Sequence, residues 1–134
     1  MKLIHKIYGT GQPLIIMHGL FGSGDNWRSI ARMMEPHYQS IVVDMRNHGR
    51  SPHDPEMNFQ VMADDILELM TDLKLEKVSL LGHSMGGKVA MQFSFLHPDL
   101  VEKLIVVDIA TKYYPPHHDV VIEAIEAIDP KQLT

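Results

Sequence analysis

The sequence predicts an α/β fold built on a doubly wound, mostly parallel sheet. Short runs of β-branched and other apolar residues alternate along the chain with longer segments of helical period. Strand–helix–strand units of this kind are joined by right-handed crossovers, which make their strands parallel. The run KLIVVDI at 103–109 is almost continuously apolar, as expected for a parallel strand covered on both faces.

The first half of the chain supplies three expected strands and one expected helix. The runs at 2–8 and 13–19 are typical of strands and are joined by a glycine turn at 9–11. The run at 40–45 is a buried strand that ends in the polar loop RNHGRSPHDPEM. A helix is expected over 25–34, because apolar residues recur there on one helical face. The residues of that face are Trp27, Ile30, Ala31 and Met34.

The second half repeats the pattern. Residues 59–73 are the clearest helix, 77–82 a strand, and 86–96 a helix that is stopped by a His-Pro pair. After the strand at 103–109, a proline-rich break precedes an amphipathic helix over 120–128. On the helix at 59–73, the residues expected to be buried are Met62, Ile66, Leu69, Met70 and Leu73. The residues expected to face water are Asp64, Asp65, Glu68 and Asp72.

Composition narrows the classes of function. The 134 residues suffice for one domain or for part of a larger one, and 45% of them are hydrophobic. The net charge of −5 and the lack of a Lys/Arg cluster argue against nucleic acid as a partner. No apolar stretch reaches the ~20 residues of a membrane span. With no cysteine and no signal-peptide pattern, we expect a cytoplasmic protein without disulfides.

The stretch LLGHSMGGKVA at 80–90 fits two kinds of site. Gly82, Ser84 and Gly86 match G-x-S-x-G, the tight strand-to-helix turn that exposes a nucleophilic serine. In that turn the backbone N–H of Met85 would face a developing oxyanion. The stretch also matches most of a phosphate-binding loop, whose lysine must be followed by Ser or Thr to hold Mg²⁺. Lys88 is followed by valine, so the sequence favours the serine site.

The loop HGLFGSGDNW, after the strand at 13–19, can supply a second oxyanion donor. Leu20 is the expected donor and Phe21 the alternative. We expect His18 to brace the loop rather than to react. In the polar loop after 40–45, Asp44 is expected to accept bonds from backbone N–H groups.

Other polar residues are assigned structural roles. His48 is expected to be structural, and Arg46 to be a surface or loop-bracing cation. The adjacent histidines of the HHD run at 117–119 cannot easily share an ion, and no third ligand is suitably spaced. We therefore expect neither a metal nor a cofactor. The ten methionines are expected mainly in the core, with a few available to line an acyl pocket.

Asp108 ends the strand at 103–109, at the sheet edge where Ser84 is expected. Ligands of doubly wound sheets lie outside the carboxyl ends of the strands. Asp108 either orients a catalytic histidine or only caps the following loop. His83, beside the serine, and Phe21 are the expected substrate-contacting residues.

Four motifs together resemble the α/β-hydrolase fold family, and more closely its small bacterial carboxylesterases and acyl thioesterases. They are HGLFGSGDNW, VVDMRNHGRS, LLGHSMGGKVA and HPDLVEKLIVVDIA, and the resemblance runs from about residue 3 to 128. It implies transfer of an acyl group to water through a Ser-acid-His triad, with Ser84 as nucleophile and Asp108 as acid. The fold also hosts non-enzymes, so a ligand-binding module without catalysis stays the alternative.

The resemblance further implies that the sheet is incomplete in this chain. The family places its catalytic histidine after a later strand, so we expect that residue beyond position 134. Residues 1–112 would then be the N-terminal part of the hydrolase core, and 113–134 the start of a cap. The expected partners are a small acyl ester or thioester and the rest of the sheet. Without the latter, self-association through the unfinished sheet edge is expected.

Overall fold

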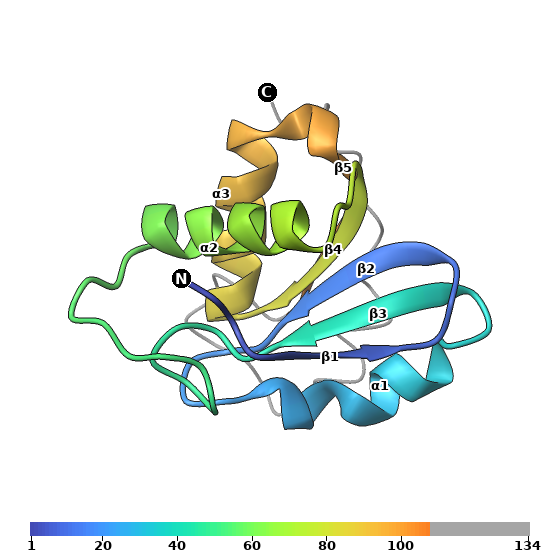
Figure 1. Cartoon of the computed structure of the whole chain (residues 1–134), viewed down its shortest axis with the longest axis horizontal. Coiled ribbons are helices and arrows are strands. Elements are labelled where there is room, and N and C mark those ends of the chain that lie inside the picture. The colour runs from blue at the N-terminus through green and yellow to red at the C-terminus, as the bar shows by residue number, and fades with distance from the viewer. Residues whose placement is uncertain (108–134) are drawn as a thin grey trace.

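The computed structural model describes residues 1–107, which fold into one five-stranded sheet with helices on both faces (Figure 1). The elements are β1 (His5–Tyr8), β2 (Gln12–Met17), the 3-10 helix η1 (Gly24–Trp27), α1 (Arg28–Met33), β3 (Tyr38–Val43), α2 (Phe59–Asp72), β4 (Val78–His83), α3 (Met85–Leu96), the 3-10 helix η2 (Pro98–Leu100) and β5 (Val101–Val107). Asp108, the expected helix at 120–128 and the proposed cap lie outside the described residues.

The strand order is β1-β3-β2-β4-β5, and all neighbours are parallel except β1 and β3. This confirms the doubly wound, mostly parallel sheet. In the middle of the sheet, Ile15 of β2 pairs with Ile41 of β3 on one side and with Leu80 of β4 on the other. The glycine turn joins β1 to β2 in the chain, but the two strands do not pair, because β3 lies between them.

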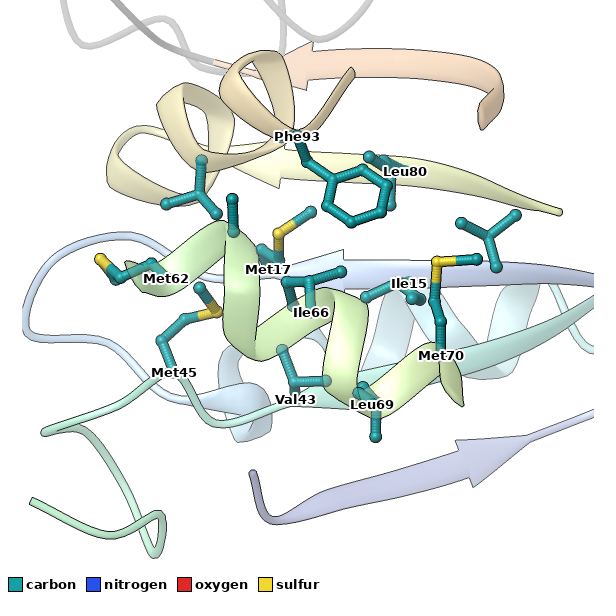
Figure 2. Packing of buried hydrophobic residues seen from close by; sticks show 14 of the residues in the cluster. Ile15, Met17, Val43, Met45, Met62, Ile66, Leu69, Met70, Leu80 and Phe93 are labelled. Carbon is teal, nitrogen blue, oxygen red and sulfur yellow. The ribbon is translucent and has the colours of Figure 1, made fainter. Parts of the chain in front are cut away.

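Two apolar layers cover the two faces of the sheet. Ile15 and Met17 of β2 face α2 and α3, where they pack with Ile66 and Phe93 (Figure 2). The intervening residues Leu14 and Ile16 face the other side, where α1 and Trp27 cover them. The alternation of neighbouring strand residues between two buried layers explains the continuously apolar strand sequences.

One local expectation was only partly correct, and another was wrong. The helix expected over 25–34 begins as the 3-10 turn η1, and its α-helical part is confined to α1. Asp65 was expected to face water, which is wrong: only 2% of its surface is exposed, although its neighbour Asp64 is exposed. Asp65 lies on the buried side of α2 because it pairs with a buried cation described below.

Candidate active site

Ser84 stands at the turn between β4 and α3, where the chain reverses within one residue. Its backbone has φ 53° and ψ −112°, a region that residues with side chains rarely adopt. The turn is tight enough to require both glycines. A Cβ on Gly82 would overlap the carbonyl of Gly86, and a Cβ on Gly86 would overlap the carbonyl of Met17. The strand–turn–helix arrangement expected from the sequence is therefore formed.

Two backbone hydrogen bonds fix this turn. The N–H of Ser84 donates to the carbonyl of Val107, at the end of β5, over 3.0 Å. The carbonyl of Ser84 accepts from the N–H of Lys88 over 3.1 Å, which starts the hydrogen bonding of α3. The N–H of Met85, the first residue of α3, has no acceptor within the helix, and no other backbone group of residues 1–107 accepts it.

The loop after β2 lies against the serine. A Cβ on Gly19 would come within 3.3 Å of the Cβ of Ser84 and within 2.8 Å of the His83 ring, so a larger residue there would displace that ring. Phe21 has a positive φ of 63°, and its N–H donates to Nε2 of His48 over 3.0 Å. The N–H of Phe21, the alternative oxyanion donor, is therefore already engaged by His48. Among the described residues, nothing accepts the N–H of Leu20, which remains the candidate.

Two buried histidines join this loop to the loop after β3. Nε2 of His18 accepts the N–H of Met45 over 2.9 Å, and its Nδ1 lies 2.7 Å from the carbonyl of Gly19. A backbone N–H can only donate, so Nε2 must be unprotonated and Nδ1 must carry the proton. The same reasoning places the proton of His48 on Nδ1, which lies 2.9 Å from the carbonyl of Arg46.

Burial is the main cause that lowers the pKa of His18 below its ordinary value. A hydrogen bond to the Gly19 carbonyl opposes the shift in part. His18 is therefore held neutral in the folded protein, as its role of accepting the Met45 N–H requires. This geometry agrees with the bracing role expected for His18 and with the structural role expected for His48.

Asp44 accepts backbone N–H groups, as expected. One carboxylate oxygen accepts from Gly24 over 2.7 Å, and the other accepts from Arg50 over 3.1 Å. The Arg50 bond lies within the loop after β3, whereas the Gly24 bond reaches across to η1. Asp44 thus also ties the two loops together.

Arg46 is a buried loop-bracing cation, so the surface alternative was wrong. Its guanidinium forms two hydrogen bonds with the Asp65 carboxylate, at 2.7 and 2.9 Å. It also donates to the carbonyl of Glu56 over 2.7 Å. The hydrogen bond to Asp65 is the main cause that raises the pKa of Arg46. A bidentate ion pair of this kind fixes the relative orientation of the two side chains more firmly than a single hydrogen bond does. It anchors the segment that leads into α2.

Ser84 opens onto a cleft of about 490 Å³ between the loop after β2, the start of α2 and the start of α3. Its lining is mostly apolar: Leu20, Met57, Asn58, Phe59, Met62, Ser84, Met85 and Lys88. Phe21 and His83 do not line this cleft. They line a separate hollow of about 420 Å³ on the other side of Leu20. The Phe21 side chain is 91% exposed, and the His83 ring lies 5.7 Å from that of Trp27.

The model of the alpha/beta hydrolase fold family matches residues 12–134. The chain belongs to the α/β-hydrolase fold family. It is 43% identical over 120 residues to esterase YbfF of Escherichia coli, covering 89% of this chain and 47% of that protein. It is 41% identical over 124 residues to the mouse sn-1-specific diacylglycerol lipase ABHD11, covering 90% and 40% respectively.

A solved structure of a marine microorganism esterase superposes with a TM-score of 0.80 at 49% identity, covering 89% of this chain and 47% of that one. The chain thus spans less than half the length of each of these three relatives. This partial coverage agrees with the expectation that the chain corresponds to the N-terminal part of an α/β-hydrolase.

For this α/β-hydrolase, sequence reasoning missed most of the cleft beside the serine. Met57, Asn58 and Phe59 lie in or just after a loop with no periodic pattern, so nothing local marked them. Two of the methionines, Met57 and Met62, do line the cleft beside Ser84. Lys88 carried a usable signal, because the helix expected after the serine places it one turn from that helix's first residues, beside the expected site.

Within residues 1–107, no group of three or more His, Asp or Glu side chains could hold a metal ion. In the same part of the chain, no helix is both long and apolar enough to cross a membrane.

Proposed function

We propose that the complete protein is a serine hydrolase that cleaves small to medium acyl esters or thioesters through an acyl-enzyme. The observation that carries this proposal is the backbone of Ser84. The strained turn raises one hydroxyl above the carboxyl end of the sheet and beside an apolar cleft. Such strain costs about 1–3 kcal/mol, and it persists where the surrounding structure demands it, most often at functional sites.

The surroundings of Ser84 suit acyl transfer. The N–H groups of Leu20 and Met85 flank the serine and are unoccupied among the described residues, so they can stabilise an oxyanion formed on the attacked carbonyl. The apolar side chains of the cleft can receive the acyl chain. His48 supports this role of Leu20, because it engages the neighbouring N–H of Phe21.

In the proposed reaction, Ser84 Oγ attacks the ester carbonyl and gives its proton to a histidine located beyond residue 134. Asp108 orients that histidine. The histidine then protonates the leaving alcohol or thiol, which leaves an acyl-serine. Water, deprotonated by the same histidine, releases the acid and restores the serine. The bond between Ser84 N–H and the Val107 carbonyl supports Asp108 as the acid, since Asp108 is the next residue in the chain.

The names of the relatives support ester hydrolysis as the reaction class. One relative is named an esterase and another a diacylglycerol lipase. The same fold also carries other reactions, so the class must be tested on this protein.

The direct test is hydrolysis of 4-nitrophenyl butyrate by the complete protein and by its Ser84→Ala variant. Loss of the nucleophile lowers kcat by about 10⁶ in a comparable triad, so the variant should be at background. Ser94→Ala is a matched control, because it removes a fully buried hydroxyl from the same helix, away from the cleft. Equal activity of Ser84→Ala and the unmodified protein would refute the proposal.

A further inference from the structure

Lys88 was singled out in the sequence as part of a phosphate-loop pattern, and the proposed hydrolysis gives it no role. It lies one helical turn after Ser84, and its backbone N–H donates to the Ser84 carbonyl. Its side chain lines the same cleft as the serine. Because both side chains line one cleft, the ammonium group of Lys88 can reach a substrate bound at the serine.

The charge of Lys88 is unbalanced within the described part of the chain. None of the ion pairs among residues 1–107 involves Lys88. Its ammonium lies 5.9 Å from the centre of the Phe59 ring, a weak cation–π contact that holds it over the cleft wall. This positive charge stands out in a chain whose net charge is −5.

The rest of the cleft adds no negative charge. None of its described lining residues is acidic. The side-chain oxygen of Asn58 already accepts the N–H of Val61 at the start of α2, whereas its NH₂ group has no partner among the described residues and can donate into the cleft. The polar groups beside the serine are thus a cation, an amide donor and unoccupied backbone N–H groups. Such a lining favours an anion.

We propose that Lys88 makes the site selective for esters that carry an anionic group, a carboxylate or a phosphate, a few bonds from the scissile carbonyl. This inference rests on the proposed hydrolase function. The apolar wall formed by Met57, Phe59 and Met62 takes the hydrocarbon part of the substrate, and Lys88 pairs with its charge at the mouth. The anionic group can belong to the acyl part or to the leaving group.

The test compares matched anionic and neutral esters with the complete protein. For the acyl side, the 4-nitrophenyl monoester of glutaric acid is compared with 4-nitrophenyl butyrate. For the leaving-group side, 4-butyryloxybenzoate is compared with its methyl ester. The quantity measured in each arm is the ratio of kcat/KM for the anionic ester to kcat/KM for the neutral ester.

Lys88→Met should lower this ratio about fivefold in one arm, mainly through KM, as expected for loss of one solvent-exposed charge pair. Lys88→Glu should lower it further, and Lys88→Arg should largely preserve it. The preference should also weaken as salt is added. Lys77→Met is the control, since Lys77 pairs with Glu102 and does not line the cleft, and it should leave the ratio unchanged.

The arm that responds identifies the part of the substrate that carries the charge. A ratio unaffected by Lys88→Met and Lys88→Glu in both arms would overturn the inference, and so would an equal loss for anionic and neutral esters. Failure of the underlying function is separable. If Ser84→Ala still hydrolyses the neutral esters, the hydrolase proposal fails. If hydrolysis needs Ser84 but ignores Lys88, only the selectivity fails.

Discussion

At Ser84 the fold holds a side-chain-bearing residue in a conformation suited to glycine. With φ at 53° and ψ at −112°, the Cβ is crowded against its own backbone. Gly82 avoids a clash with the start of α3, and Gly86 avoids one with the end of β2, but nothing relieves the strain at the serine itself. The backbone strain at Ser84 should lower the free energy of unfolding by a measurable amount.

Ser84→Gly should be more stable than Ser84→Ala by about 1 kcal/mol. Both variants lack the hydroxyl, so their difference reports on the backbone alone. Glycine removes a strain of about 1–3 kcal/mol, partly offset by the greater entropy of its unfolded chain, about 0.4–1 kcal/mol. Urea unfolding of the two variants measures this difference. A less stable glycine variant would show that the turn is not strained.

His18 offers a second test at a single residue. Burial lowers its pKa in the folded protein, so below about pH 6.5 the unfolded chain binds the additional proton. The free energy of unfolding should therefore fall as the pH is lowered from about 6.5 towards the folded pKa, and the contribution is fully present above this window. Protonation would also put a hydrogen on Nε2, facing the N–H of Met45.

Replacing His18 with glutamine should flatten this part of the stability profile, because the amide does not titrate. Urea unfolding between pH 5 and pH 8 measures the effect. His53→Gln serves as a control, since His53 is exposed in the loop after β3. Identical pH dependence in His18→Gln and the unmodified protein would contradict the assignment of His18 as a buried neutral acceptor.

At the scale of elements, α2 shows where a sequence pattern succeeds and where it fails. The spacing of Met62, Ile66 and Leu69 predicted the helix and its buried face correctly. The same pattern placed Asp65 in water, because a periodicity argument treats every carboxylate as solvent-facing. Its partner Arg46 is 19 residues earlier, in a loop without periodicity. A long-range pair of this kind leaves no local signal.

Removing one member of that pair should be costly. Asp65→Asn removes the buried counter-charge of Arg46 and leaves only the exposed Asp54 carboxylate, 3.9 Å away. Breaking a buried pair in this way typically destabilises a protein by about 3–5 kcal/mol. Asp64→Asn changes the exposed neighbour and should stay within about 0.5 kcal/mol of the unmodified protein. Chemical unfolding of the two variants provides the comparison. Equal stabilities would mean that the pair does not anchor α2 to the loop after β3.

At the scale of the molecule, the parallel core was predictable and the pairing at its edge was not. Continuous apolar runs and the intervening helices indicated a parallel sheet, and β2, β3, β4 and β5 form one. The short strand β1 pairs antiparallel with β3, a partner 32 or more positions away. No local pattern encodes that choice, since it depends on which edge is free once the core is assembled.

The candidate site likewise has one part that the sequence predicts and one part that it does not. The turn around Ser84 was predictable, because its two glycines and the serine form a motif of five consecutive residues. The cleft was not, because its walls come from three segments that only the folded sheet brings together. Phe21 and His83, expected to contact substrate, line the neighbouring hollow, and Phe21 is almost fully exposed.

The central claim is that Ser84 is a nucleophile, and covalent labelling tests it most directly. The complete protein is treated with a fluorophosphonate, and the adduct is located by peptide mass spectrometry. We predict one adduct, on the peptide that carries Ser84, and none in Ser84→Ala. An unlabelled protein, or an adduct that persists in Ser84→Ala, would contradict the account.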